Sequence, residues 1–263
     1  MKLQTALITG ASSGIGKALA RKFANNGYDI VVVARQEKLL EEVAAELSLF
    51  RDISVTVIAK DLTHETAPQE IYDELKARKI VVDVLVNDAG VGQRGVFHET
   101  DLAKSINVIR LNVEALTRMT NLFLTDMVAR NSGKILNVGS VAGFEPGPLT
   151  AVYHASKAYV LSFSEAIAEE VKDTNVQITV VCPGPTDTDF FRNADMEDLK
   201  PSGKGAVMEP HEVANLGYEG FVRGELVVTP GINNKSVTMS RKFGAASVQV
   251  KHRKYYEAAK TRQ

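Results

Sequence analysis

Short apolar runs rich in β-branched residues alternate along the chain with longer amphipathic stretches. The apolar runs predict strands at Leu3–Thr9, Ile30–Ala34, Val55–Ala59, Val81–Asn87, Lys134–Gly139, Val176–Cys182 and Leu226–Pro230. The amphipathic stretches predict helices near residues 15–26, 36–49, 65–78, 101–130, 152–173 and 209–223. Strands and helices that alternate in this way are joined by right-handed crossovers, which give a parallel sheet covered on both faces. We therefore predict an α/β fold with a doubly wound parallel sheet of about seven strands.

No change of composition and no Pro- or Ser-rich linker divides the chain, so we expect one domain over residues 1–263. Two stretches interrupt the alternation. Residues 184–208 are irregular and follow a predicted strand, which is typical of a loop that binds substrate. Residues 235–263 form a basic C-terminal extension with eight Lys and Arg residues and one acid, Glu257. This extension is either a solvated face or subunit contact, or a surface for a membrane or an acidic partner.

Composition adds limits rather than a function. The chain is 44% hydrophobic and 24% charged, as expected for a soluble globular protein. Its net charge of −1 gives no general attraction to nucleic acid or to anionic membranes. One cysteine excludes an internal disulfide, and neither a signal peptide nor a transmembrane segment is evident. We therefore expect a cytoplasmic protein.

A glycine-rich loop follows the first predicted strand and opens the first predicted helix. Gly10, Gly14 and Gly16 stand in the run Thr9–Gly16, with the spacing G-x-x-x-G-x-G. Glycine lets a backbone approach a pyrophosphate closely, and a helix N-terminus supplies free N–H groups and a positive dipole. A glycine cluster alone also occurs in tight turns, but its place in a series of βαβ units favours a dinucleotide site.

The end of the second predicted strand indicates which dinucleotide is bound. Proteins that bind NAD place an acid there to hold the ribose 2′-hydroxyl, whereas a 2′-phosphate requires a cation. This strand ends Val33-Ala34-Arg35, so Arg35 can hold a phosphate with the help of the Ser12 hydroxyl. We predict NADP(H) as the cofactor. The alternatives are that Arg35 is a surface arginine at the start of a helix, and that the protein prefers NAD.

A candidate catalytic group lies in the second half of the chain. Tyr153 and Lys157 are four residues apart and share one face of a predicted helix, and Ser140 precedes Tyr153 by thirteen positions. A lysine ammonium beside a phenol favours the phenolate, so we expect Lys157 to lower the pKa of Tyr153. A phenol tuned in this way can exchange a proton near neutral pH, which hydride transfer to or from a carbonyl carbon requires.

These motifs resemble those of the short-chain dehydrogenase/reductase family, and the resemblance covers nearly the whole chain. Thr9–Gly16 matches the family's T-G-x-x-x-G-x-G, and Tyr153-His154-Ala155-Ser156-Lys157 matches its Y-x-A-S-K. Asn112 matches a helix asparagine that completes the family's catalytic tetrad. The resemblance implies a single Rossmann-type domain, an oxidoreductase activity, and a homodimer or homotetramer that pairs through the helices carrying Asn112 and Tyr153.

The resemblance also implies a role for each of these residues. Tyr153 would be the general acid in reduction and the general base in oxidation, and Ser140 would hydrogen-bond the substrate oxygen. Lys157 would hold the ribose of the nicotinamide, and Asn112 would hold a water that links Lys157 to solvent. The implied cofactor-binding residues are Gly10, Ser12, Ser13, Gly14, Ile15, Gly16, Arg35, Asp61, Leu62, Asn87, Ala89, Gly90, Tyr153, Lys157, Pro183, Gly184, Thr186 and Thr188.

One position departs from the family pattern. Members usually carry Asn-Asn-Ala-Gly after the fourth strand, where this chain has Asn87-Asp88-Ala89-Gly90. Asp88 replaces an amide that typically ties neighbouring strands, and an ionised carboxylate accepts hydrogen bonds but cannot donate one. The change concerns the local geometry and not the type of reaction.

Other kinds of site have less support. The histidines at positions 64, 98, 154, 211 and 252 lack a ligand spacing, so no metal site is predicted, and His154 should point away from the face of Tyr153. Cys182 ends an apolar run and is expected to be buried and inert. Ser140 does not stand in a G-x-S-x-G elbow, which argues against a hydrolase. A non-catalytic NADP(H)-binding or scaffold protein on the same fold remains an alternative.

The substrate is less defined than the reaction. The expected walls of the pocket are residues 141–149, 91–97 and 186–208, whose apolar members are Val91, Val96, Phe97, Phe144, Pro146, Leu149, Phe190, Phe191 and Met196. This surface favours a small-molecule carbonyl or alcohol substrate of medium size and apolar character. Sugar, 3-oxoacyl and steroid-like substrates remain open.

Overall fold

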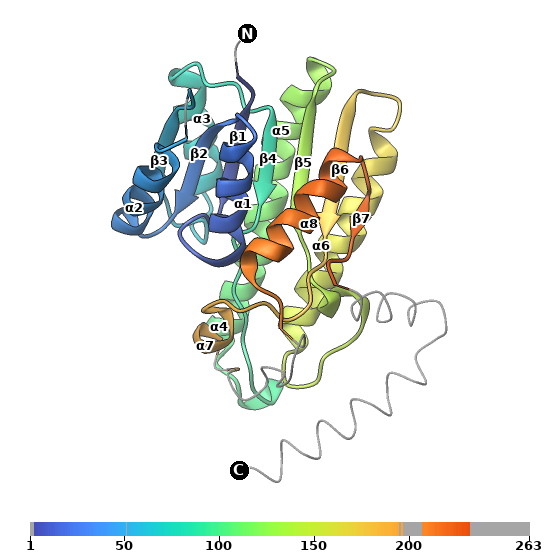
Figure 1. The fold of residues 1–263 in the computed structure, drawn as a ribbon. Helices are drawn as coiled ribbons and strands as arrows, with labels where there is room; N and C mark the ends of the chain where they lie inside the picture. Colours follow the sequence, from blue (N-terminus) through green and yellow to red (C-terminus); the bar gives the residue numbers. More distant parts are fainter. Residues whose placement is uncertain (1–2, 51, 195, 197–206, 232–263) are drawn as a thin grey trace.

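Seven parallel strands form one sheet in the computed structural model, which describes residues 3–50, 52–194, 196 and 207–231. The strands are β1 (Thr5–Thr9), β2 (Asp29–Ala34), β3 (Val55–Ala59), β4 (Val84–Asn87), β5 (Gly133–Val138), β6 (Val176–Val181) and β7 (Val227–Val228). Their order in the sheet is β3-β2-β1-β4-β5-β6-β7 (Figure 1). The predicted α/β fold with a doubly wound parallel sheet is confirmed. The basic extension 235–263, and residues 195 and 197–206 of the expected substrate loop, lie outside the described residues.

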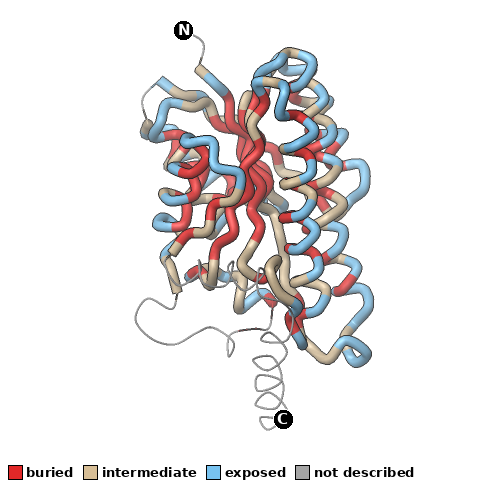
Figure 2. The backbone as a smooth tube through the Cα atoms, turned by 90° about the vertical axis from the view of Figure 1, so that its right-hand side faces the viewer, coloured by how far each residue is buried: buried red, intermediate tan, exposed pale blue. Residues whose placement is uncertain are grey.

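Helices cover both faces of the sheet. One face carries α1 (Gly14–Asn25), α2 (Glu37–Leu47) and α8 (Pro210–Val222), and the other carries α3 (Ala67–Ala77), α5 (Leu116–Ala129) and α6 (Ala151–Glu170). Side chains of β1 alternate between the two layers, since Ala6 and Ile8 pack toward the first and Leu7 toward the second. Figure 2 shows the buried strands between helices whose outer surfaces are exposed. Burial on both faces explains why the strands are continuous apolar runs in the sequence.

The stretch expected to be one helix over 101–130 has three parts. It consists of α4 (Leu102–Ile109), a π-helical segment (Arg110–Ala115) and α5. A π segment holds one extra residue per turn, and such segments often occur where a side chain has a function. Here the segment contains Asn112, which is buried.

Three short helices were not expected from the sequence pattern. Two are 3-10 helices, at Phe97–Glu99 and Val141–Phe144, and the third is α7 (Phe190–Asn193) within the stretch expected to be an irregular loop. All three follow the carboxyl ends of strands or their loops. Residues of the 3-10 helix at Val141–Phe144 and of α7 line the cavity described below. Helices this short give little periodicity in the sequence, which is why they were not predicted.

The order in which strands are added to the sheet reverses between β1 and β4. From β1 the chain proceeds outward through β2 and β3, and then returns to the other side of β1 with β4. Loops that leave neighbouring strands on opposite sides open a crevice at this point, outside the carboxyl ends of the strands. The glycine loop after β1 and the Asn87–Gly90 segment after β4 therefore face each other.

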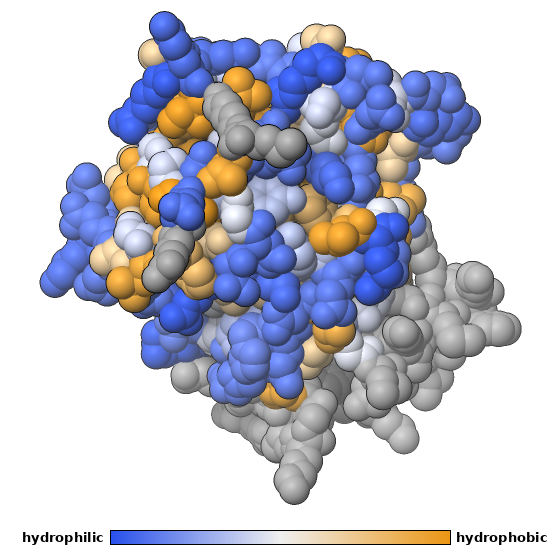
Figure 3. Space-filling view, turned by 45° about the horizontal axis from the view of Figure 1, so that its top comes forward, coloured by the Kyte–Doolittle hydropathy of each residue, from blue (hydrophilic) through white to orange (hydrophobic). Residues whose placement is uncertain are grey.

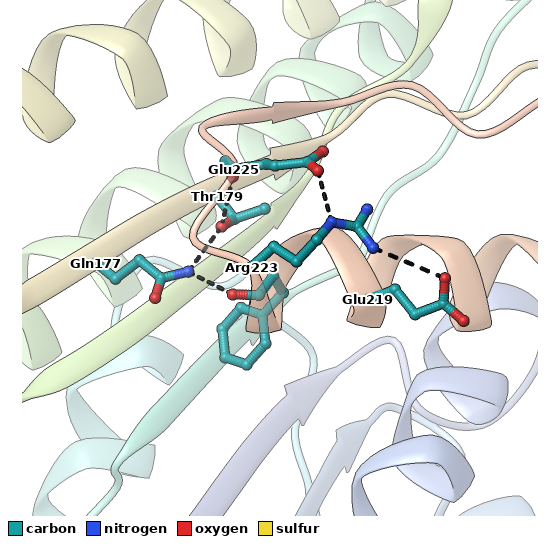
Figure 4. Close-up of polar contacts among 6 residues, drawn as sticks. Gln177, Thr179, Glu219, Arg223 and Glu225 are labelled. Atoms are coloured by element: carbon teal, nitrogen blue, oxygen red, sulfur yellow. Dashed lines mark hydrogen bonds and ion pairs between the residues drawn. The ribbon is translucent and has the colours of Figure 1, made fainter.

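Polar contacts attach the edge strand β7 and the end of α8 to the neighbouring strand β6 (Figure 4). Gln177 Nε2 donates to the carbonyl oxygen of Phe221 at 2.5 Å, and Thr179 Oγ1 donates to the carbonyl oxygen of Glu225 at 2.9 Å. Arg223 Nε donates to Glu225 Oε1 at 2.7 Å across the turn between α8 and β7. These contacts position α8, which packs on α1 behind the glycine loop.

The face brought forward in Figure 3, toward the amino ends of the strands, is mostly hydrophilic, with apolar patches scattered over it. Scattered apolar groups are normal on a protein surface. The features that indicate chemistry lie at the other end of the sheet.

Candidate active site

A cavity of about 850 Å³ lies at the carboxyl ends of the strands. Its lining comes from the segments that follow β1 to β6, together with α6 and α7. Residues distant in the sequence, such as Gly10, Asp61, Ser140 and Thr188, therefore surround one space. The position agrees with the crevice expected where the strand order reverses.

The glycine loop forms one wall of this cavity. Gly10 and Gly14 have φ angles of +70° and +56°, which favour glycine. A Cβ on Gly10 would lie 2.9 Å from the backbone nitrogen of Ala89, so the loop also requires glycine for its close contact with the segment after β4. Ser13 precedes α1 without a side-chain cap hydrogen bond. The N–H groups of the first turn thus remain available to a ligand at Ser12, Ser13, Gly14 and Ile15, which line the cavity.

A second part of the cavity lies at the ends of β2 and β3. Arg35, Asp61 and Leu62 line it as predicted, together with Gln36 and Lys60, which the sequence interpretation did not name. Burial raises the pKa of Asp61, but hydrogen bonds from the backbone and hydroxyl of Thr63 and the charge of Arg35 outweigh burial and hold the pKa below its usual value. Lys60 Nζ pairs with Glu70 Oε2 at 2.6 Å. Arg35 is exposed and lines this part of the cavity, and the other cation of this part, Lys60, is paired with an acid.

Ser140, Tyr153 and Lys157 meet in the cavity, although they come from different elements. Ser140 follows β5, and its Oγ accepts a hydrogen bond from the backbone N–H of Ala142 at 3.1 Å. Tyr153 lies in the first turn of α6, and Lys157 lies one turn later. Lys157 Nζ donates to the carbonyl oxygen of Val138 at 2.8 Å and lies 6.0 Å from the centre of the Tyr153 ring. The three side chains can therefore act on one substrate.

The expectation that Lys157 lowers the pKa of Tyr153 is wrong. Burial raises the pKa of Tyr153 to about 12; a hydrogen bond with Ser140 opposes this rise, and the charge of Asp88 adds to it. The sequence argument considered the nearby cation but neither the burial of the phenol nor the carboxylate behind it. Tyr153 is consequently a neutral phenol near pH 7, which is the form that donates a proton.

Lys157 is itself perturbed by its surroundings. The residue is only 7% exposed, and burial lowers its pKa, whereas the charges of Asp88 and Cys182 raise it. Asp88 lies within the cavity lining, next to the glycine loop, and is the residue that replaces the family's amide. The substitution thus puts an acid near Lys157.

Asn112 connects the site to the helices behind it. Its Oδ1 accepts from the backbone N–H of Val91 at 2.9 Å, and its Nδ2 donates to the Val91 carbonyl at 2.9 Å and to Ser156 Oγ at 3.0 Å. Ser156 in turn donates to the carbonyl oxygen of Tyr153 at 2.7 Å. The π segment therefore holds the loop after β4 against the start of α6. The expected water-holding role of Asn112 stays a prediction. Both amide protons of Asn112 are already donated, so such a water would have to donate a hydrogen bond to the Asn112 side-chain oxygen.

Two predicted cofactor residues lie outside the cavity lining. Asn87 points into the core, where its Nδ2 donates to Asn137 Oδ1 at 2.9 Å and to Thr120 Oγ1 at 3.1 Å. Gly16 lies behind the loop, where a Cβ would be 2.5 Å from both the Gly10 carbonyl oxygen and Asp88 Oδ2. Both residues support the site through packing. Ala89, Gly90, Pro183, Gly184, Thr186 and Thr188 do line the cavity.

The segment after β6 brings α7 next to Tyr153. Thr188 Oγ1 accepts from the backbone N–H of Phe190 at 3.3 Å, which starts this short helix. The Phe190 ring lies 5.1 Å from the Tyr153 ring at an angle of 47°. A Cβ on Gly92 would lie 2.7 Å from Phe190 Cζ, so a glycine is needed there for α7 to approach. Phe190 therefore forms a wall of the cavity directly beside Tyr153.

A comparison with known protein families agrees with the geometry of this cavity. The short chain dehydrogenase family matches residues 4–198. The chain belongs to the short-chain dehydrogenase/reductase family. The family resemblance seen in the sequence is therefore confirmed, and so is the Rossmann-type domain.

Individual relatives of this short-chain dehydrogenase share its fold and its class of reaction. Sulfoacetaldehyde reductase 2 of Chromohalobacter salexigens is 38% identical over 186 residues, covering 70% of this chain and 73% of that protein. A short-chain dehydrogenase from Sphingobium yanoikuyae, solved in complex with NADPH, has a TM-score of 0.82 and 33% identity, covering 91% and 94%. The bulky-bulky ketone specific alcohol dehydrogenase of Comamonas testosteroni has a TM-score of 0.78 and 29% identity, covering 99% and 95%. The protein is thus an oxidoreductase acting on CH–OH and C=O groups.

The active site of this short-chain dehydrogenase contains one further residue that the sequence interpretation misplaced. His154 was expected to point away from Tyr153, but it lines the same cavity. Its Nδ1 lies 2.8 Å from the carbonyl oxygen of Glu145, and a Cβ on Gly147 would lie 2.2 Å from its Cδ2. His154 therefore fixes the loop at 145–149, and Gly147 in the sequence was the signal of this close contact.

Five of the nine apolar residues expected in the substrate walls line the cavity, namely Val91, Leu149, Phe190, Phe191 and Met196. Phe97 is instead 62% exposed. Among the cavity residues that the structure describes, the lysines and arginines are Arg35, Lys60 and Lys157, so the substrate half beside α7 contains none apart from Lys157.

Within the described part of the chain, three or more His, Cys, Asp or Glu residues are nowhere grouped so that they could hold a metal ion. The helices of the described ranges also include none that is long and apolar enough to cross a bilayer.

Proposed function

We propose that this short-chain dehydrogenase interconverts a carbonyl compound and an alcohol with NADP(H), and that Tyr153 is the general acid and base. The observation that supports this most strongly is that Ser140, Tyr153 and Lys157 share one cavity with the glycine loop. A hydride acceptor and a proton donor can then meet at the same carbonyl group.

The residues present fit a dinucleotide. Gly10 and Gly14 adopt positive φ angles, and Ser13 before α1 makes no side-chain cap hydrogen bond, which leaves the N–H groups of Gly14 and Ile15 to a ligand. Such a loop accepts a pyrophosphate. Arg35 at the end of β2 suits a ribose phosphate, and Lys157 and Tyr153 at the other end of the cavity suit the nicotinamide ribose.

In the proposed mechanism, bound NADPH would supply a hydride for the carbonyl carbon. Tyr153, which is neutral near pH 7 because burial raises its pKa to about 12, donates its proton to the carbonyl oxygen. The Ser140 hydroxyl stabilises the negative charge that develops on that oxygen. Lys157, fixed by the Val138 carbonyl, orients the ribose, and Asn112 keeps the start of α6 in place through Ser156.

The proposal is tested by following the absorbance of NADPH with a panel of ketones, aldehydes and diketones. Turnover of at least one compound supports it. Tight binding of NADPH without turnover of any compound would instead favour a non-catalytic binding or scaffold protein. The complete set of Asn112, Ser140, Tyr153 and Lys157 argues against that alternative, since a scaffold does not need all four.

Replacing Arg35 by Ala should change the cofactor preference. A charge-assisted contact to the 2′-phosphate is worth about 1.5–3 kcal/mol, so the ratio of kcat/KM for NADPH to that for NADH should fall by about 10- to 100-fold. The measurement compares both cofactors at a fixed carbonyl concentration.

Lys38→Ala is the matched control for Arg35→Ala. Lys38 is an exposed cation on α2 outside the cavity lining, so its loss changes the net charge equally without removing a cavity group. If Arg35→Ala and Lys38→Ala leave the same ratio as the unmodified protein, Arg35 does not hold a phosphate, and the NAD-preferring alternative gains support.

For the substrate, we propose an uncharged, apolar carbonyl compound of medium size. The cavity has an apolar lining, which is made by Val91, Leu149, Phe190, Phe191 and Met196. The backbone of Leu149 has a φ of +67°, and its carbonyl oxygen accepts a hydrogen bond from the N–H of Gly95. A sulfonate, as in the substrate named for the Chromohalobacter relative, would need a cation. The ketone class named for the Comamonas relative agrees better with this lining.

Replacing Phe190 by Ala should widen the space beside Tyr153. We expect the kcat/KM of a bulky aryl ketone to rise about 10-fold relative to that of a small aliphatic ketone, the scale of steric selection in a hydrophobic pocket. Phe97→Ala is the control, because Phe97 is an exposed phenylalanine outside the cavity lining. An equal change of the ratio in both variants, or none in Phe190→Ala, would show that the Phe190 ring does not select the substrate.

We also propose that the protein forms a homodimer or homotetramer in the cytoplasm. Leu102, Ile106 and Ile109 on α4 are 67%, 37% and 42% exposed, and Tyr159 on α6 is 37% exposed. Apolar side chains exposed near the helices of Asn112 and Tyr153 support pairing through this surface.

A further inference from the structure

The carboxyl group of Asp88 lies beneath the glycine loop. Its Oδ2 is 2.5 Å from the position that a Cβ would take on Gly16 and 3.0 Å from the corresponding position on Gly10. The backbone N–H of Gly16 donates a hydrogen bond to this carboxyl group. Thr9 Oγ1 accepts from the N–H groups of Asp88 and Ala89, both at 3.1 Å, and so holds the backbone in place. Asp88 is therefore a fixed part of the loop's support.

A carbonyl oxygen shares this space. The Gly10 carbonyl oxygen is also 2.5 Å from the Cβ position on Gly16, so it lies at most 5.0 Å, the sum of the two distances, from Asp88 Oδ2. An ionised carboxylate only accepts hydrogen bonds and is repelled by a carbonyl oxygen, whereas a neutral carboxyl group can donate to one. The surroundings on this side favour the neutral form.

The charged groups around Asp88 act in both directions. Burial has the largest effect and raises the pKa of Asp88 to about 7, while the Lys157 ammonium on α6 and the Gly16 N–H lower it. Tyr153 on the same helix is neutral at this pH, and the Cys182 thiol after β6 interacts with Lys157 and Tyr153. Both forms of Asp88 are therefore populated near neutral pH.

We propose that Asp88 is a positioning residue of the glycine loop that takes up a proton when a dinucleotide binds, so that cofactor affinity falls as the pH rises. This inference rests on the proposed function, because it requires a pyrophosphate at the glycine loop. The pyrophosphate brings negative charge to the wall formed by Gly10, Gly14 and Ile15, and it displaces water from the cavity that Asp88 also lines. Both effects disfavour a second negative charge at Asp88. The proton comes from the solvent, and no covalent bond changes.

The sign of the pH effect follows from proton linkage. Below the pKa of the free protein, Asp88 already carries the proton, and binding requires no uptake. Above it, the ionised form must be neutralised before the loop reaches its bound state, so the Kd for NADPH should rise about 5- to 10-fold between about pH 6 and pH 8.

Titration calorimetry of NADPH with the unmodified protein and with Asp88→Asn tests the inference. Asparagine restores the amide usual in the family and cannot titrate. We expect Asp88→Asn to show a Kd that changes at least 3-fold less than that of the unmodified protein over the same pH range. The 2′-phosphate of NADPH titrates near pH 6, but it contributes equally to both proteins.

Proton uptake is measured directly by repeating the titration of both proteins at about pH 7 in two buffers with different ionisation enthalpies. A buffer-dependent heat that is larger in the unmodified protein than in Asp88→Asn supports the inference. Equal pH slopes and equal uptake in the two proteins would overturn it while leaving the proposed function intact. Failure of both proteins to bind NADPH or NADH at any pH would overturn the proposed function and this inference together.

Discussion

Tyr153→Phe should lower kcat for carbonyl reduction by about 10²- to 10⁴-fold, the contribution of a positioned general acid. The ring would still pack beside Phe190, so the shape of the cavity is kept and only the hydroxyl is lost. The Kd for NADPH should therefore change by no more than about 5-fold, since one neutral hydrogen bond contributes about 1 kcal/mol. Single-turnover kinetics and fluorescence titration separate the two quantities.

Tyr159→Phe is the matched control for this prediction. Tyr159 lies on the same helix, and its hydroxyl is 2.8 Å from Thr117 Oγ1, away from the cavity. We expect its kcat to stay within about 2-fold of the unmodified value, as for a substitution away from the site. Full activity of Tyr153→Phe would remove Tyr153 from the mechanism, and equal losses in both variants would indicate damage to α6.

The raised pKa of Tyr153, about 12, also predicts the pH dependence of the two directions. Reduction uses the neutral phenol, which predominates at every pH below the pKa, so Tyr153 alone gives no loss of rate between about pH 6 and pH 9. Oxidation uses the phenolate, whose population rises about 10-fold per pH unit in the same range. Alcohol oxidation should therefore increase steadily toward alkaline pH, and the increase should be absent in Tyr153→Phe.

The fold was predictable because the central strands are buried on both faces. Runs such as Ile30–Ala34 are continuously apolar, and the loops between them carry the turn residues, so periodicity identified the elements and their order. The π segment at Arg110–Ala115 was not predictable, because a helix with one extra residue per turn differs little in pattern from an ordinary helix. What requires it is a tertiary contact, the paired hydrogen bonds between Asn112 and Val91.

The parts of the candidate site that are local sequence motifs were predictable. The properties that depend on contacts between distant parts of the chain were not. The turn from Tyr153 to Lys157 and the glycine loop are local patterns, and the structure brings both to the cavity. The pKa of Tyr153 depends on burial and on Asp88, which is distant in the sequence, and the expectation for it failed for that reason. Asn87 was assigned to the cofactor by resemblance, yet its amide is used by Thr120 and Asn137 in the core.

Gly143 allows the segment that carries Ser140 to approach the helix that carries Tyr153. It lies in the 3-10 helix that follows Ser140, and its N–H donates to the Ser140 carbonyl at 3.0 Å. A Cβ on Gly143 would lie 2.6 Å from the carbonyl oxygen of Lys157 and 3.2 Å from the backbone nitrogen of Ala158. These are backbone atoms of α6 and cannot move aside as a flexible side chain can. The glycine thus sets how closely the end of β5 approaches the helix that carries Tyr153 and Lys157.

Gly143→Ala should therefore separate Ser140 from Tyr153 and lower kcat by about 10²-fold, the effect of a displacement of about 1 Å in a catalytic group. Overpacking should also reduce the free energy of unfolding by about 1–3 kcal/mol, measured by urea denaturation. Gly217→Ala on α8 is the control, because its Cβ would meet only side-chain atoms of Val181, 3.2 Å away, outside the cavity. Since alanine also favours a helix, Gly217→Ala should keep its activity and lose less stability. Unchanged kcat in Gly143→Ala would show that the contact between the two elements does not set the catalytic geometry.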